Sequence, residues 1–313
     1  MTLAGRFWPR SLDRLPPPVE RYFEVEPGIR LLAHCHWQPE SARSALVIVH
    51  GLEGSSESRY VLGTAEKAWV AGLHVVRMNQ RNCGGTEALA PTLYNSGLSG
   101  DFRAVLRELS EVDGLREIFL AGFSMGGNLV LKAAGEIGRE PAPVAAFAGV
   151  AAVCPALDLA ACVDAIHEPR NAFYERYFVR NLIRRYRRKV ELFPQHFALN
   201  GVEGIRTIRE FDDLITAPYC GYGNAANYYD RASAKHVLDS IRVPALVITA
   251  QDDPMVPHAS VRRPELLDNP RITLLDPAHG GHCAFISRHG GGEERFWAEC
   301  RIVEFCRSHS KLA

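Results

Sequence analysis

The sequence predicts an α/β fold, with a mostly parallel central sheet flanked by helices and an inserted helical cap. Short, continuously apolar runs such as Ala45–Val49 are typical of strands that are buried on both faces. These runs alternate with segments of helical periodicity, an order that favours parallel strands joined by right-handed crossovers. The alternation stops between residues 156 and 236, where arginine and aromatic residues are frequent and no clear buried strand occurs. We therefore expect this stretch to be the cap.

The elements are expected in the following order. After an extended lead-in over residues 1–18, two extended runs around Pro27-Gly28 predict a hairpin. Ser99 or Asp101 is expected to cap the helix that begins near residue 101. We expect strands over 45–49, 73–78, 118–123, 144–153, 244–250 and 271–275, and helices over 60–71, 101–109, after Ser124 and over 293–307. We assign residues 1–155 and 237–313 to the core and residues 156–236 to the cap.

Composition excludes several classes of protein. The chain has 313 residues with 36 Lys+Arg and 36 Asp+Glu, so its net charge gives no indication of a nucleic-acid partner. No secretory leader and no apolar run of about 20 residues is recognisable, so we expect a cytoplasmic protein without an integral membrane segment. The eight cysteines form no Cys-x-x-Cys pair. We therefore expect reduced thiols, and neither a metal nor a cofactor.

A nucleophilic serine is indicated by Gly122-Phe123-Ser124-Met125-Gly126. An apolar run precedes this segment and a helix-like run follows it, which is the layout of a nucleophile elbow. The sharp strand-to-helix turn of an elbow brings the backbone close to itself, so Gly122 and Gly126 must lack side chains. We expect Ser124 to adopt a strained backbone conformation with an exposed hydroxyl.

Acyl transfer by a serine needs a base and an acid that orients the base. The acid candidates are Asp252 and Asp253, and we prefer Asp253 because the turn that follows it aims its carboxylate back over the sheet edge. The base candidates are His279 and His282. We prefer His282 because two glycines free the backbone just before it.

The developing oxyanion needs two backbone donors. One is expected to be the amide of Met125, which follows the nucleophile. The other is expected from the loop after the strand that ends at His50, and we choose the Leu52 amide because the chain turns at His50-Gly51.

A basic run, residues 184–189, lies within the expected cap. One interpretation is contact with an anionic lipid surface or head group. The other is a solvated helix face. The cap aromatics likewise suit either lid packing or an acyl pocket, and these two roles overlap if the lid closes over the site.

Five motifs together resemble the YheT-like α/β-hydrolases, bacterial relatives of the eukaryotic ABHD-type lipid hydrolases. The resemblance implies an α/β-hydrolase fold with a helical cap and hydrolysis of acyl esters, with Ser124 as nucleophile, Asp253 as acid and His282 as base. Asn82 and Asn95 depart from the family pattern, and neither belongs to this triad. The motifs are residues 50–55, 82–86, 93–101, 122–128 and 252–254.

The predicted function is a serine esterase that cleaves carboxylic esters of short to medium acyl chain. The expected partner is a small-molecule or lipid acyl ester, with no nucleic acid and with peripheral membrane contact as an option. Two alternatives stay open: a lipase or phospholipase at a membrane surface, and a catalytically silent binding protein on the same fold.

Overall fold

A computed structural model describes residues 10, 12–39, 43–287 and 294–312 of the chain. Its centre is one eight-stranded sheet in the order β1-β2-β4-β3-β5-β6-β7-β8, in which β1 and β2 are antiparallel to their neighbours and the other strands are parallel. The strands are β1 (Val19–Glu26), β2 (Ile29–His36), β3 (Ser44–Val49), β4 (His74–Met78), β5 (Glu117–Phe123), β6 (Phe147–Val153), β7 (Ala245–Ile248) and β8 (Ile272–Leu275). The predicted mostly parallel α/β sheet and its N-terminal hairpin are confirmed. Most of the lead-in, residues 1–9 and 11, lies outside the described residues.

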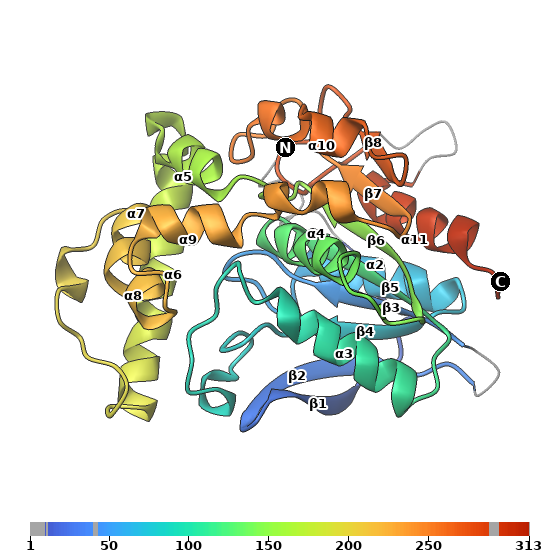
Figure 1. Cartoon of the computed structure of the whole chain (residues 1–313), viewed down its shortest axis with the longest axis horizontal. Helices are drawn as coiled ribbons and strands as arrows, with labels where there is room; N and C mark the ends of the chain where they lie inside the picture. Colours follow the sequence, from blue (N-terminus) through green and yellow to red (C-terminus); the bar gives the residue numbers. More distant parts are fainter. Residues whose placement is uncertain (1–9, 11, 40–42, 288–293, 313) are drawn as a thin grey trace.

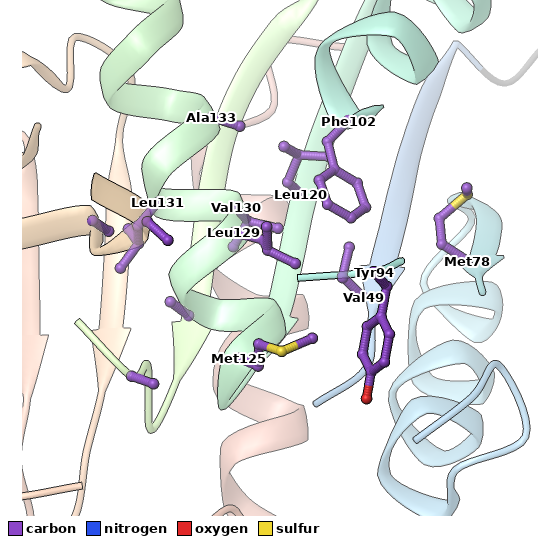
Figure 2. Packing of buried hydrophobic residues seen from close by; sticks show 14 of the residues in the cluster. Val49, Met78, Tyr94, Phe102, Leu120, Met125, Leu129, Val130, Leu131 and Ala133 are labelled. Carbon is purple, nitrogen blue, oxygen red and sulfur yellow. The ribbon is translucent and has the colours of Figure 1, made fainter. Parts of the chain in front are cut away.

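Helices cover both faces of the sheet because successive strand residues point to opposite sides (Figure 1). Val47 and Val49 pack in a buried cluster with α3 (Ser99–Glu111) and α4 (Met125–Ile137). Leu46 and Ile48, which alternate with those valines, pack instead with α2 (Arg59–Val70) and α11 (Trp297–His309). Figure 2 shows the first cluster around α4, where Leu129 and Val130 share it with Leu120 of β5.

The predicted cap of α3 is wrong. The residue before the helix is Leu98, and no side chain makes a capping hydrogen bond there. The Ser99 hydroxyl donates to Glu136 on α4. Asp101 accepts a hydrogen bond from the Arg81 guanidinium at 2.8 Å. Both side chains therefore have long-range partners that compete with capping.

The segment between β6 and β7 contains helices and no strand, and it gathers beyond one end of the sheet (Figure 1). Its longest element, α6 (Ala172–Leu192), carries the basic run. Besides short 3-10 turns, the segment also contains α5 (Leu159–His167), α7 (Ile208–Phe211), a π-helical turn (Asp212–Thr216), α8 (Ala217–Tyr219) and α9 (Ala225–Ala232). The short α10 (Pro264–Leu267) follows β7. Within the described residues, none of the helices has the length and apolar composition needed to cross a membrane.

Parallel strands bring four loops together at one edge of the sheet, because their carboxyl ends point the same way. β3 leads into the loop that begins at His50, and β5 leads into Ser124. β7 leads to Asp252 and Asp253, and β8 to His279 and His282. Every residue that the sequence marked as a candidate therefore belongs to this edge or to the start of α4.

Candidate active site

Ser124 lies on a tight turn between β5 and α4, with φ 54° and ψ −117°. This positive φ is uncommon for a residue with a side chain. A Cβ atom on Gly122 would lie 2.2 Å from the carbonyl oxygen of Gly126, and one on Gly126 would lie 2.4 Å from the carbonyl oxygen of His50. Only glycine fits at either position, so the turn depends on both.

Ser124, His282 and Asp253 form one continuous set of hydrogen bonds. His282 Nε2 lies 2.9 Å from Ser124 Oγ, and His282 Nδ1 lies 2.9 Å from Asp253 Oδ2. These partners assign the proton on Nδ1, which donates to the carboxylate, while Nε2 accepts from the serine hydroxyl. The Asp253 side chain is fully buried, and its Oδ1 also accepts from the backbone amides of Met255 and Val256. A serine, a neutral imidazole and a fixed carboxylate are the groups that nucleophilic acyl transfer requires.

Mutual interaction shifts the pKa values of Asp253 and His282 in opposite directions. Burial by itself would raise the pKa of Asp253, but the charge and hydrogen bond of His282 and two backbone amides outweigh burial and hold it below its usual value. Burial would likewise lower the pKa of His282, and Asp253 outweighs it and raises that pKa above its usual value. The carboxylate is therefore charged across the neutral range and favours a proton on the imidazole.

Asp252 and His279, the other two candidates, lie apart from Ser124 and contact each other at 3.4 Å. Asp252 Oδ1 accepts hydrogen bonds from the amides of Gly280 and Gly281 at 2.9 and 2.7 Å. Because those glycines immediately precede His282, Asp252 fixes the loop that carries the imidazole. No motif in the sequence indicated this contact, apart from the neighbouring Asp253.

The loop after β3 leaves the Leu52 amide available. The Gly51 amide donates to the Tyr60 hydroxyl at 3.0 Å. Among the hydrogen bonds of the described residues, the amides of Leu52 and Met125 donate to no protein acceptor. Leu52 and Met125 both line the cavity that contains Ser124. Both amides are thus free to donate to a group bound beside Ser124.

The His50 ring holds the start of this loop through two hydrogen bonds. Its Nε2 accepts from the Gln80 amide at 3.2 Å, so its Nδ1 carries the proton and donates to the Gly51 carbonyl at 2.7 Å. Burial lowers the pKa of His50 to about 4, which keeps the ring neutral in that arrangement. The sequence indicated His50 only as the end of a strand, and its structural role was missed.

Arg185 joins α6 to the same loop. Its guanidinium contacts both carboxylate oxygens of Glu53 at 3.1 Å each, and it also donates to the carbonyl oxygen of Asn82. The Glu53 side chain is 2% exposed and accepts from the Tyr94 hydroxyl. Glu53 and Asn82 both have positive φ, 57° and 63°. One partly buried arginine therefore holds two strained loops at the site.

A cavity of about 980 Å³, part of it open to solvent, contains Ser124 and His282. Much of its wall is apolar and comes from α5 and α6. The apolar lining from these helices includes Leu159, Val163, Ile166, Phe178 and Leu182. Of the aromatics that the sequence marked in the cap, Phe178 and Tyr186 line the cavity, whereas Phe173 and Tyr177 are exposed.

Asp212 is a cavity residue that the sequence did not indicate. It begins the π-helical turn, and its carboxylate accepts from the Tyr229 hydroxyl at 2.8 Å. Burial raises the pKa of Asp212 to about 6. No motif marks it, because its burial follows from how the helices pack.

Cys154, His282 and Cys283 form a group of three potential metal ligands. The ligand atoms of Cys154, His282 and Cys283 lie within 4.8 Å of one another. Both ring nitrogens of His282 already contact Asp253 or Ser124, so an ion here would have to break one of those contacts. The expectation that no metal or cofactor is needed stays a prediction.

Comparison with known proteins identifies relatives along most of the chain. Residues 44–288 match the family described as alpha/beta hydrolase fold. The YheT protein of Escherichia coli is 35% identical over 268 residues, which cover 84% of this chain and 76% of that protein. The monoacylglycerol lipase of Saccharomyces cerevisiae is 29% identical, and the match covers 85% of this chain but only 60% of the lipase. The chain therefore spans less than two thirds of that relative. The solved structure of the Pyrococcus furiosus esterase Pf2001 aligns with a TM-score of 0.64 at 15% identity, covering 96% of this chain and 95% of the esterase, which shows likeness of fold.

Proposed function

Since the chain belongs to the α/β hydrolase fold family, we propose that it is a serine hydrolase that cleaves carboxylic esters of short to medium acyl chain. The observation that carries the proposal is the unbroken contact from Ser124 Oγ through the His282 ring to the buried Asp253 carboxylate. The esterase and lipase names of the relatives agree with hydrolysis of an ester.

In the proposed mechanism, Ser124 Oγ attacks the ester carbonyl carbon while His282 Nε2 takes the hydroxyl proton. Asp253 accepts the hydrogen bond from Nδ1–H and stabilises the imidazolium. The carbonyl oxygen becomes an oxyanion that accepts hydrogen bonds from the amides of Leu52 and Met125. The tetrahedral intermediate collapses to an acyl-enzyme, and Nε2 returns the proton to the departing alcohol. In the second half, His282 Nε2 takes a proton from a water that attacks the acyl carbon. The second tetrahedral intermediate then releases the acid, and Nε2 returns the proton to Ser124 Oγ.

The cavity supports an acyl substrate. Ser124 lines a space whose α5 and α6 walls are largely apolar, which suits a hydrocarbon chain. We propose that residues 156–236 act as a cap on a core formed by the rest of the chain, because α5 and α6 supply this wall. Arg185 ties the cap to the Glu53 loop.

A lipase or phospholipase acting at a membrane surface is the second candidate. Two observations favour it: a relative is named monoacylglycerol lipase, and exposed arginines and aromatics share one face of α6. A catalytically silent binding protein is the third reading, and the complete set of Ser124, His282 and Asp253 contacts argues against it.

Turnover of p-nitrophenyl esters tests the proposal. The wild-type protein should hydrolyse acetyl to octanoyl esters, and Ser124→Ala should lose a factor of about 10⁴ or more in kcat. Ser308→Ala is the matched control, because Ser308 is exposed on α11 at the far end of the chain. Wild-type turnover by Ser124→Ala would refute the proposal. Activity confined to long-chain esters or to lipid dispersions would favour the lipase.

A further inference from the structure

Helix α6 has two charged faces that point in opposite directions. Arg185 and Lys189 of the basic run face inward, where Arg185 binds Glu53 and Lys189 donates to backbone carbonyl oxygens. Arg176, Arg180, Arg184 and Arg187 are exposed. Their spacing of three and four residues places these four on one face of the helix. We call them the α6 arginine stripe.

The α6 arginine stripe lacks ion-pair partners among the described residues. Within the described part of the chain, none of its four guanidinium groups forms an ion pair, and Arg188 beside them pairs with Glu191 at 2.9 Å. A row of like charges without partners repels itself, so a folded protein gains nothing from it alone. An anionic partner outside the chain would supply the missing countercharge.

Apolar side chains also lie beside the stripe. The arginines border an open groove of about 1440 Å³, a volume that includes solvent, whose lining contains the mostly buried Val179, Ile183, Val202 and Ile205 and the carboxylates of Glu191 and Glu203. Phe173, one turn before Arg176, is 67% exposed, and Tyr177, directly after Arg176, is 39% exposed. Arginines together with exposed aromatics on one helix are typical of segments that lie in a membrane interface.

The opposite side of the same helix reaches the candidate active site. Phe178 and Leu182 of α6 line the cavity that contains Ser124, while the stripe faces solvent. A bilayer seated on the stripe would therefore lie one helix away from the acyl cavity. A nucleic acid would satisfy the charges equally well, but it would not explain this position beside an apolar cavity.

We propose that the α6 arginine stripe, with Phe173 and Tyr177, docks the protein on the surface of a bilayer rich in anionic phospholipid. Each arginine strengthens attachment to such a surface by about fivefold at physiological salt. The phosphates of the lipid head groups pair with the guanidinium groups, and the two aromatic rings enter the interface. The docking does not require turnover.

Vesicle sedimentation with the full chain tests the proposal. The protein should bind vesicles of phosphatidylcholine with 30% phosphatidylglycerol, bind pure phosphatidylcholine far more weakly, and dissociate in 0.5 M NaCl. Ser124→Ala should bind equally well, so a failure of the proposed catalysis would not affect this result. Equal binding to both kinds of vesicle, or binding to neither, would overturn the proposal.

Charge reversal locates the surface. The triple variant Arg180→Glu, Arg184→Glu and Arg187→Glu should weaken vesicle binding by at least about 100-fold. The matched control reverses Arg242, Arg271 and Arg307, which are also exposed and lie outside α6, and it should retain most of the binding. Circular dichroism and thermal unfolding check that both variants fold, and glutamine replacements serve if a reversal does not. Equal loss in both variants would overturn the proposal.

Phe173→Ser separates a membrane from a nucleic acid. It should weaken vesicle binding several-fold and leave binding to a DNA duplex unchanged, because a bilayer interface accepts the ring whereas a duplex keeps its bases stacked and is bound through its phosphates. Tight binding to the duplex, with unchanged vesicle binding by Phe173→Ser, would assign the stripe to nucleic acid and overturn the proposal.

Discussion

Arg185 on α6 donates hydrogen bonds to both carboxylate oxygens of Glu53, the residue that follows Leu52 in the loop after β3. Glu53 is almost completely buried and has a positive φ of 57°. A bidentate arginine–carboxylate pair fixes orientation as well as distance. The direction of the adjacent Leu52 amide, the proposed oxyanion donor, therefore depends on a residue of the helical segment.

Arg185→Lys is expected to keep the positive charge but lose the bidentate contact with the Glu53 carboxylate. We expect kcat on a soluble ester to fall by about 100-fold with a smaller change in KM, because a displaced oxyanion donor acts on the transition state. Steady-state kinetics measure the split between kcat and KM. Arg170→Lys is the control, since Arg170 pairs with Glu168 at the surface. A rise in KM alone would assign Arg185 to substrate binding instead.

Asp252 should affect activity through the loop that it holds. Asp252→Ala removes the acceptor for the Gly280 and Gly281 amides, and we expect kcat/KM to fall by about tenfold. Asp252→Asn keeps an acceptor oxygen at that place, so it should retain most of the activity. If the asparagine variant lost as much as the alanine variant, the charge of Asp252 rather than its hydrogen bonds would matter.

Asp253→Asn should lower kcat far more, by a factor of about 10⁴. The asparagine amide cannot stabilise the imidazolium, and it favours the wrong tautomer of the His282 ring. The two neighbouring aspartates thus give a matched pair for one assay. Similar losses at both positions would contradict the separate roles that their contacts indicate.

The pH profile follows from the raised pKa of His282. The base must be neutral to accept the serine proton, so activity should fall as pH drops through this pKa. We expect the acid limb of kcat/KM to lie above 6.5, the ordinary value for histidine. In Asp253→Asn the charge that raises the pKa is gone, so the limb of the residual activity should move to lower pH. If the acid limb stayed at the same pH in Asp253→Asn, titration of His282 would not be its cause.

The elbow should reject any side chain at Gly126. Gly126→Ala would place Cβ 2.4 Å from the His50 oxygen and 2.6 Å from the Val49 oxygen. Because both are backbone atoms, we expect a loss of at least about 3 kcal/mol in the free energy of unfolding. Gly100→Ala in α3 is the control, since its Cβ meets nothing within 4 Å and alanine favours a helix. Denaturant unfolding compares the two, and equal stability would refute the close approach.

Local pattern was sufficient for most of the fold. Apolar runs such as 45–49 are buried on both faces of a parallel sheet, and the alternation of strands and helices sets the crossovers. The turn after Asp253 and the glycines before His282 were sufficient to prefer these two residues over their neighbours, and in the structure His282 contacts Ser124 while Asp253 contacts His282. Strand β6 begins at Phe147, three residues later than expected, because Val144 accepts a turn hydrogen bond from the Phe147 amide.

Contacts between distant segments could not be predicted. Nothing in the basic run itself indicates that Arg185 faces the buried Glu53 side chain whereas Arg184 faces solvent. The direction of each side chain depends on how α6 packs. The same holds for Ser99 and Asp101, whose capping was a sound local expectation until Glu136 and Arg81 competed for them. Side-chain partners of this kind follow from the assembled sheet.

Labelling with a fluorophosphonate probe, located by mass spectrometry of the digested protein, tests the central claim most directly. The probe reacts with a serine only when a base and an oxyanion site activate it. We predict a single modified residue, Ser124, with labelling lost in His282→Gln and strongly reduced in Asp253→Asn. Folded wild-type protein that takes up no probe, or that carries it on another residue, would contradict the assignment of Ser124 as the nucleophile.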